Sequence, residues 1–168
     1  MAVQLRTQRA GDLGWVFQRH AELYPGEFSY SPVFEQYVAR GMSPFLDHFD
    51  AKRDRMWIAE SEGRRLGSVA VHHVDDRPGW AKLRWYFVEA EARGHGVGGK
   101  LLGAAIGFCR EAGYEGVFLW TVNDLAAAAR QYSKAGFVLV FEESKPCAWA
   151  PWGREQRWEL NLPPLRRP

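Results

Sequence analysis

A glycine-rich turn at residues 93–100, Arg-Gly-His-Gly-Val-Gly-Gly-Lys, constrains the fold of this chain more than any other stretch. It follows an apolar segment at residues 83–88 that is typical of a strand, and it leads into a helical pattern at residues 101–109. Glycine lets the backbone approach a ligand closely, and the free N–H groups at the start of a helix attract anions. Four glycines between Arg93 and Lys100 therefore favour a phosphate site over a tight turn without a ligand.

Composition and length bound the remaining possibilities. The 168 residues, 46% of them apolar, predict a single domain at residues 1–162 with a frayed tail at residues 163–168. The net charge of +2 is too small to suggest a nucleic-acid-binding surface. Cys109 and Cys147 lack the spacing of a zinc site, so we expect no metal. The chain has neither a signal-peptide pattern nor a run of about 18 apolar residues, which predicts a cytoplasmic protein that does not enter a membrane.

Hydrophobic periodicity and turn residues predict alternating blocks of strands and helices. The first helix is expected to end at Pro25 and Gly26, and the second to be interrupted at Gly41 and Pro44. The expected strands are residues 3–6, 56–59, 66–74, 83–88, 116–121, 137–141 and 157–162. The expected helices are residues 12–24, 32–40, 45–49, 101–112 and 123–135. A hairpin turn is expected at residues 62–63, and Gly113 is expected just past the end of the helix at 101–112.

The glycine turn formally matches two common nucleotide motifs, and each match lacks part of its chemistry. Gly94-x-Gly96-x-x-Gly99 resembles a dinucleotide fingerprint, but the preceding strands form a hairpin series and Glu115 precedes the next strand, where no ribose-binding acid belongs. A P-loop would need a serine or threonine after its lysine to hold magnesium, and Leu101 stands there.

A third pattern, Arg93-x-x-Gly96-x-Gly98, resembles the pyrophosphate-binding signature of the GNAT superfamily of acetyl-CoA-dependent N-acetyltransferases. Val88 precedes Arg93 by five positions, as in the cofactor-contacting strand of that family. The segment at residues 120–137 is similar to the second half of the family's site. The resemblance implies an α/β fold, with a mixed, mainly antiparallel sheet of six or seven strands that is flanked by helices and splayed at the cofactor site. More narrowly, the chain resembles the acetyltransferase half of MarR–GNAT fusion proteins.

The resemblance also implies roles for individual residues in binding acetyl-CoA. Backbone groups of Phe87 and Val88 would pair with the pantetheine arm and polarise the thioester carbonyl. The pyrophosphate would lie on the turn formed by Arg93, Gly94, His95, Gly96, Val97 and Gly98, with Arg93 supplying charge and shaping the turn. Tyr132, which its spacing places on the apolar side of its expected helix, would protonate the leaving thiolate, or else be a core tyrosine. Asn123 would orient the pantetheine or a water molecule, or cap the following helix.

The acceptor is expected to be a primary amine of a small molecule or peptide, attacked directly without an acyl-enzyme. Residues 82–86 contain no glutamate, which some family members carry there, so the general base stays open among Glu22, Glu27, His72, His73 and water. Aromatic side chains would line the acceptor pocket: Tyr24, Phe28, Tyr30, Trp85, Trp120, Trp149 and Trp152. A non-catalytic acyl-CoA sensor and a transferase of larger acyl groups remain alternatives, and we expect a monomer or homodimer.

Overall fold

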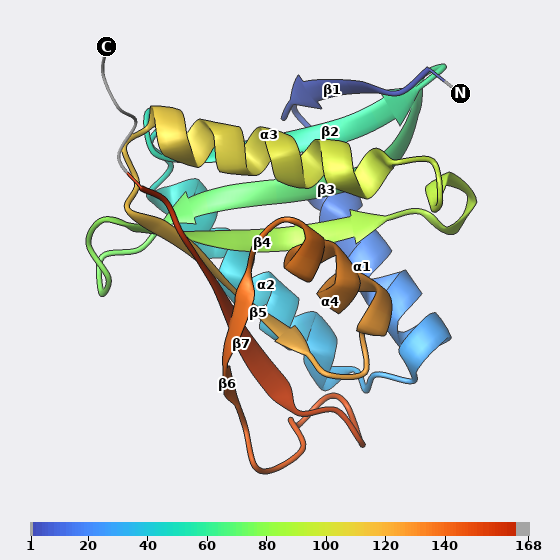
Figure 1. Ribbon diagram of the computed structural model, residues 1–168. Coiled ribbons are helices and arrows are strands. Elements are labelled where there is room, and N and C mark those ends of the chain that lie inside the picture. Colours follow the sequence, from blue (N-terminus) through green and yellow to red (C-terminus); the bar gives the residue numbers. More distant parts are fainter. Residues whose placement is uncertain (1, 164–168) are drawn as a thin grey trace.

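The computed structural model describes residues 2–163 as seven strands, four α-helices and one short 3₁₀ helix (Figure 1). The frayed tail predicted from residue 163 lies, apart from that residue, outside the described part. The strands are β1 (Gln4–Thr7), β2 (Arg55–Ser61), β3 (Arg64–His73), β4 (Trp80–Val88), β5 (Gly116–Val122), β6 (Val138–Glu142) and β7 (Glu155–Asn161). The helices are α1 (Asp12–Phe28), α2 (Val33–Asp47), η1 (Ala90–Ala92), α3 (Val97–Glu111) and α4 (Ala126–Lys134).

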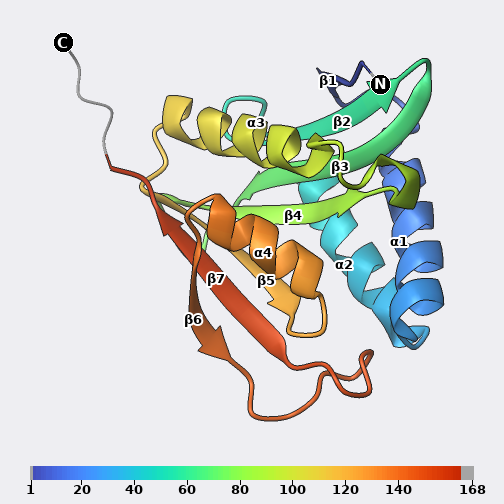
Figure 2. The ribbon, with the colours of Figure 1, turned by 45° about the vertical axis from the view of Figure 1, so that its right-hand side comes forward.

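The strands form one sheet in the order β1-β2-β3-β4-β5-β7-β6. Every neighbouring pair is antiparallel except β4 and β5, which are parallel. These two strands pair only from Trp80 opposite Gly116 to Lys82 opposite Phe118, and beyond that point they diverge (Figures 1 and 2). The predicted α/β class, with a mainly antiparallel seven-stranded sheet that splays at its centre, is confirmed.

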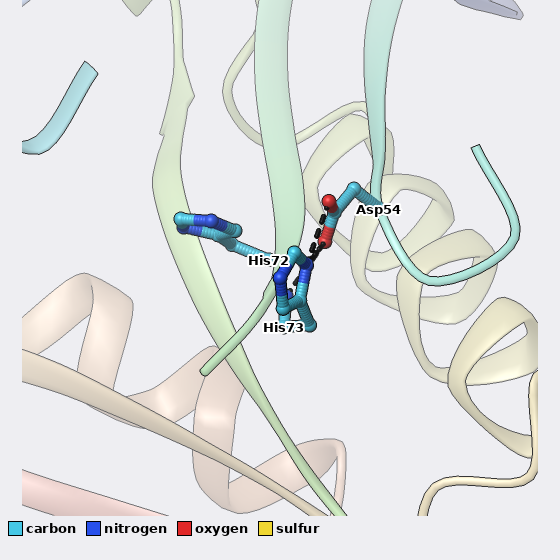
Figure 3. A group of neighbouring side chains, drawn as sticks. All are labelled: Asp54, His72 and His73. Atoms are coloured by element: carbon cyan, nitrogen blue, oxygen red, sulfur yellow. Dashed lines mark hydrogen bonds and ion pairs between the residues drawn. The ribbon is translucent and has the colours of Figure 1, made fainter. Parts of the chain in front are cut away.

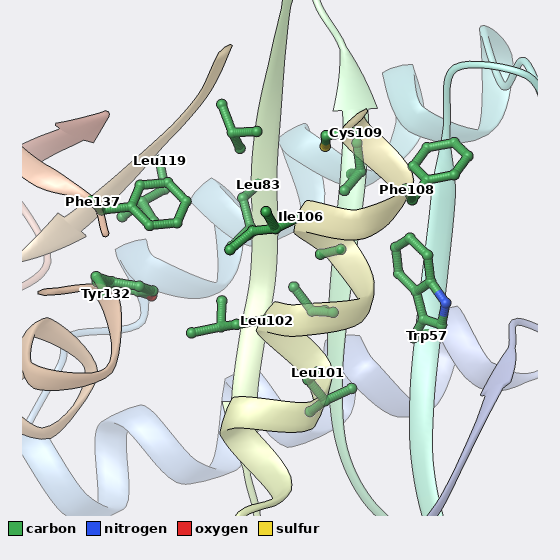
Figure 4. Close-up of a cluster of buried hydrophobic side chains, with 14 of the residues drawn as sticks. Trp57, Leu83, Leu101, Leu102, Ile106, Phe108, Cys109, Leu119, Tyr132 and Phe137 are labelled. Atoms are coloured by element: carbon green, nitrogen blue, oxygen red, sulfur yellow. The ribbon is translucent and has the colours of Figure 1, made fainter. Parts of the chain in front are cut away.

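Helices cover both faces of the sheet and divide the core into two clusters (Figure 2). On one face, Leu101, Leu102 and Ile106 point from α3 toward the strands, and Tyr132 and Phe137 close this cluster near α4 (Figure 4). On the other face, α1 and α2 pack against the second cluster. Its buried members are Val16, Tyr30, Phe34, Val38, Met42, Phe45, Met56, Ile58, Ala70, Trp85, Phe87, Val122 and Ala150.

Two turns predicted from glycine are confirmed by their backbone angles. Glu62 and Gly63 both have positive φ, 51° and 75°, and form the tight hairpin between β2 and β3. Gly113, with φ of 81°, follows α3, as expected for the residue just past a helix end.

The predicted ends of the first two helices are wrong. Helix α1 continues through Pro25 to Phe28, and Ser29, with φ of 56°, ends it. Helix α2 runs unbroken through Gly41 and Pro44. Proline and glycine weaken isolated helices, but burial of an apolar stripe on each helix outweighs that cost.

The predicted short helix at residues 45–49 is therefore only the end of α2. A similar correction applies to α4, which begins at Ala126 rather than at Asn123. Its N-cap position is Leu125, and no side chain caps it. Asn123 is thus not a helix cap, because its main chain still pairs with Arg154 beside β7.

Buried His20 makes the stability of the fold depend on pH. Its side chain is 4% exposed, and its Nδ1–H donates to the Val16 carbonyl at 2.8 Å. Burial lowers the pKa of His20 from 6.5 to about 4. Between these values the unfolded chain binds a proton that the folded chain does not, so stability rises with pH and is lost as pH falls from 6.5 toward 4.

Between pH 7 and pH 4 the unfolding free energy should fall by about 3 kcal/mol less in His20→Gln than in the wild-type protein. This amount corresponds to the difference between the folded and unfolded pKa values of His20. Urea unfolding at pH 7 and pH 4 measures it. His48→Gln is the matched control, because His48 is exposed at the end of α2. An unchanged pH dependence in His20→Gln would contradict the prediction.

Candidate functional site

An irregularity in β4 shapes the point where β4 and β5 separate. The pairing of β3 with β4 shifts register between Ser68 and Ala70, and Trp85 has a left-handed φ of 48°. The Ser68 hydroxyl donates to the Trp85 carbonyl at 2.6 Å and holds this bulge. Such a conformation is unfavourable for a bulky residue and is concentrated at functional sites.

The bulge changes which side chains face α1 and α2. Leu83 and Tyr86, three positions apart, both pack in the cluster under α3. Trp85 and Phe87 pack in the cluster under α1 and α2. Arg84 meets Gly41 of α2, so it lies on that second face as well. Adjacent residues Arg84 and Trp85 therefore both point toward α1 and α2, which simple strand alternation would not allow.

The predicted anion-binding turn lies directly beyond β4. Gly94 and Gly96 have φ of 80° and 77°, which only glycine adopts without strain. Helix α3 begins at Val97, and no side chain caps its N-terminus. Its first N–H groups have no intrahelical partner, and the helix dipole adds positive charge. The turn brings His95, Gly96, Val97 and Gly98 together at a site suited to a phosphate group.

Gly98 brings the turn close against the end of β4. A Cβ atom at this position would overlap the Tyr86 hydroxyl and lie 3.6 Å from Val88 Cγ2. Only hydrogen fits between the start of α3 and Tyr86. The neighbouring Gly99 has no such restriction, since nothing lies within 4 Å of a Cβ there.

Arg93 ties the turn to β4 and α1. Its Nε donates to the Val88 carbonyl at 3.1 Å, and its two terminal nitrogens bind the Glu27 carboxylate at 2.9 Å each. This ion pair raises the pKa of the Arg93 guanidinium. Of the two predicted roles of Arg93, these contacts favour shaping the turn over supplying charge to a ligand.

Tyr132 lies on α4 at the divergence of the two strands. Its side chain is 5% exposed, and its ring centroid is 5.6 Å from that of Tyr86 and 6.0 Å from that of Phe137. Burial raises the pKa of Tyr132 well above its ordinary value, so the hydroxyl keeps its proton near neutral pH. Within residues 2–163 that hydroxyl makes no hydrogen bond, which leaves it available to a ligand in the adjoining cleft.

Asn123 follows β5 at the same edge of the sheet. Its Oδ1 accepts a hydrogen bond from the Arg154 N–H at 2.9 Å, and its own N–H donates to the Arg154 carbonyl at 3.0 Å. Asn123 thus joins the end of β5 to the segment before β7. Its side-chain oxygen is engaged, and its amide nitrogen is left to meet a ligand or water.

A cleft of about 110 Å³ opens beside Tyr132 and between α1, α2 and the diverging strands. Five of the seven aromatic residues predicted for the acceptor pocket line this cleft. Phe28 and Trp152 do not, and Trp152 is 89% exposed. The lining aromatic side chains are Tyr24, Tyr30, Phe34, Tyr37, Trp85, Tyr86, Trp120, Tyr132 and Trp149.

The cleft also contains charged residues to which the sequence reasoning gave no role: Lys82, Arg84 and Glu155. The sequence does contain a signal for this site, because Lys82 and Arg84 stand at alternating positions in an otherwise apolar segment. A buried strand rarely carries unpaired charge without a functional reason.

The four side chains proposed as bases are either bound in ion pairs, as Glu22 and Glu27 are, or buried, as His72 and His73 are. Glu22 binds Arg19, and Glu27 binds Arg93. Asp54 accepts from the His73 main chain at 2.6 Å and from its ring at 2.8 Å, while the His72 ring points away from this carboxylate (Figure 3). Ligand atoms of Asp54, His72 and His73 lie within 4.8 Å of one another, but the carboxylate oxygens already serve as hydrogen-bond acceptors.

Comparison with known proteins agrees with this geometry. Residues 17–137 match the model of the acetyltransferase (GNAT) family, which is more than half of the chain. The chain belongs to this family. The seven-stranded sheet and the turn at residues 93–98 are thus those of a GNAT acetyltransferase.

Individual relatives are distant. N-acetyltransferase 8 of Homo sapiens is 34% identical over 97 residues, which are 56% of this chain and 42% of that protein. The chain thus spans less than half the length of that relative. A GNAT-family acetyltransferase from Staphylococcus aureus has a TM-score of 0.75 and 18% identity, covering 96% of this chain and 100% of that one.

A putative acetyltransferase from Salmonella typhimurium, solved with its cofactor acetyl-CoA, has a TM-score of 0.72 and 17% identity. The alignment covers 100% of this chain and 98% of that chain. At such identities the likeness supports the fold alone.

Among the described residues of this chain, no helix has the length and apolar character needed to cross a bilayer.

Proposed function

We propose that this protein transfers an acetyl group from acetyl-CoA to a primary amine of a small molecule or peptide by direct attack. The observation that carries the proposal is the uncapped start of α3 beside the diverging strands β4 and β5, with the free Tyr132 hydroxyl nearby. Family membership supports the same chemistry. The narrower resemblance to MarR–GNAT fusion proteins remains a prediction.

The residues around the turn fit acetyl-CoA by their chemistry. The N–H groups of His95, Gly96, Val97 and Gly98 would hold the pyrophosphate, and the positive φ of Gly94 opens the turn for it. Arg93 would keep the turn in shape through Glu27 and Val88. Main-chain groups of Phe87 and Val88 would meet the pantetheine arm.

When bound, acetyl-CoA supplies an acetyl thioester whose leaving thiol has an ordinary pKa of about 8.5. The Tyr132 hydroxyl is protonated at neutral pH and would donate its proton to the departing sulfur as the thiolate leaves. Asn123 would orient the arm or a water through its amide nitrogen. The amine must lose a proton to attack, and water or Glu155, whose pKa is raised by burial in the same cleft, would accept it.

Direct attack, without an acyl-enzyme at Cys109, agrees with the burial of that residue. Cys109 is fully buried under α3, and burial raises its pKa to about 12, so its reactive thiolate is scarce. We therefore expect Cys109→Ala to retain wild-type turnover within about twofold, measured as thiol release from acetyl-CoA, since the residue acts only in packing. Loss of turnover in a variant that still unfolds cooperatively would indicate an acyl-enzyme.

The proposal is tested in two steps. Thermal denaturation with and without acetyl-CoA measures binding, and thiol release with a panel of primary amines then measures transfer. Stabilisation followed by amine-dependent thiol release supports the proposal. Stabilisation without release would favour an acyl-CoA sensor, and stronger stabilisation by longer acyl-CoAs would favour a larger acyl group. Absence of any stabilisation would overturn the assignment.

A further inference from the structure

Arg84 differs from most of the half-buried arginines of the sheet and its flanking helices in having no carboxylate partner. Among residues 2–163 it makes no ion pair and no hydrogen bond to a carboxylate. Burial lowers its pKa, which is the effect of removing a charge from water without pairing it. The half-buried Arg6, Arg19 and Arg77 each bind a carboxylate. Arg55 has no carboxylate partner either, but it donates to the Ala51 carbonyl and lies over the Phe108 ring.

The position of Arg84 is built by its neighbours. Its guanidinium rests on Gly41 of α2, where a Cβ atom would overlap it, and lies 5.0 Å from the Trp85 ring centroid. Ala81 and Leu83 pack under α3, so ordinary strand alternation puts Arg84 on the opposite face, toward α2. An unbroken helix with a glycine at the point of contact thus makes room for an unpaired cation at the wall of the cleft.

A second cation lies in the same cleft. Lys82 faces the same side of β4, and burial together with Arg84 lowers its pKa to about 8. It forms no ion pair in the part of the chain that the structure describes. Glu155 is the one carboxylate among the residues that line the cleft, so it can offset at most one of the two positive charges.

A third donor without a partner among residues 2–163 lines the same cleft. The Trp149 indole N–H is buried and makes no hydrogen bond to residues 2–163. Its ring stacks on Tyr37 at 4.3 Å between centroids, and both side chains line the cleft. Buried polar groups are normally satisfied, so an unpaired donor here indicates a missing acceptor atom.

We propose that Arg84 and Lys82 bind a carboxylate on the acceptor, with its apolar body against the aromatic walls, so that the substrate is an amine-bearing carboxylic acid such as an apolar α-amino acid. This inference rests on the proposed acetyl transfer and names its substrate class. A carboxylate would satisfy the guanidinium fork of Arg84. A polyamine would instead place further positive charge beside two buried cations, which disfavours it.

Binding without turnover tests the subsite directly. The probes are 3-phenylpropionate and 3-phenylpropionamide, which share an aromatic body and lack an amine, and tryptophan fluorescence reports their binding. We expect the wild-type protein to bind the acid at least about tenfold more tightly than the amide, as a charge-assisted bidentate contact implies. Arg84→Gln should abolish this preference.

Two further variants separate charge, position and folding. Gly41→Ala keeps Arg84 but forces its guanidinium away, and alanine is favoured over glycine in a helix, so the variant should fold and lose most of the preference. Arg110→Gln, on the exposed side of α3, should keep it. Equal binding of acid and amide by the wild-type protein, or an unchanged preference in Arg84→Gln, would overturn the subsite.

Kinetics then connect the subsite to the reaction. With L-phenylalanine and L-phenylalaninamide as acceptors, Arg84→Gln should lower kcat/KM for the acid about 10- to 100-fold more than for the amide. For each acceptor, kcat/KM of Arg84→Gln is divided by that of the wild-type protein, so the different basicity of the two amines cancels. If the protein binds the acid selectively but acetylates no amine, the proposed transfer is wrong and the carboxylate subsite stands. If Arg84→Gln lowers kcat/KM equally for both acceptors, the carboxylate subsite is wrong.

Discussion

Replacing Tyr132 with phenylalanine is expected to lower kcat about 100-fold while leaving the Kd of acetyl-CoA within about twofold. The hydroxyl makes no hydrogen bond within the described residues, so its removal breaks no contact of the folded protein. What is lost is a proton donor at the thiol leaving group, and general acids typically contribute about 10²- to 10⁴-fold. The lower end applies because a thiol of pKa about 8.5 departs with little help.

Steady-state thiol release and fluorescence titration with acetyl-CoA measure the two quantities. Tyr114→Phe is the matched control, because the Tyr114 hydroxyl donates to the Arg53 carbonyl at a surface away from the cleft, and we expect unchanged kcat. A Tyr132→Phe variant with wild-type kcat would return Tyr132 to the role of a core tyrosine. A rise in the Kd of acetyl-CoA with unchanged kcat would show a binding role instead.

The sequence was most informative where a residue's conformation depends on its own chemistry. Gly63 and Gly113 were predicted at turns, and both have the left-handed φ that turns of this kind need. The glycine turn before α3 was predicted for the same reason. Tyr132 was placed on the inner side of its helix by spacing alone, and it is buried.

Features that depend on long-range packing could not be predicted from the sequence. Pro25 and Pro44 stay inside helices because the apolar faces of α1 and α2 are buried against the sheet. The left-handed Trp85 results from a register shift against β3 and from the Ser68 hydroxyl, which is 17 positions away. The position of Arg84 at the cleft wall depends on its contact with Gly41 inside an unbroken α2, a helix that the sequence predicted to be interrupted at Gly41.

Replacing Gly98 with alanine is expected to raise the Kd of acetyl-CoA about 10- to 100-fold, because the turn loses part of its contact with an anion and each hydrogen bond to a charged group contributes about 1.5–3 kcal/mol. The added methyl would overlap the Tyr86 hydroxyl, so either Tyr86 or the first turn of α3 must move. Gly99→Ala is the matched control. It has open space, should bind acetyl-CoA normally, and should gain up to about 1 kcal/mol of stability.

A double variant separates this collision from a general effect of alanine in the turn. Tyr86→Phe removes the overlapping oxygen, and the next ring atom, Cζ, lies 3.4 Å from the added Cβ, an ordinary contact distance. Tyr86→Phe combined with Gly98→Ala should therefore recover most of the acetyl-CoA affinity. If the double variant binds as weakly as Gly98→Ala alone, the Tyr86 hydroxyl is not what limits the turn. If Gly98→Ala itself binds acetyl-CoA as tightly as Gly99→Ala, the start of α3 does not hold the pyrophosphate, and the proposed cofactor site is wrong.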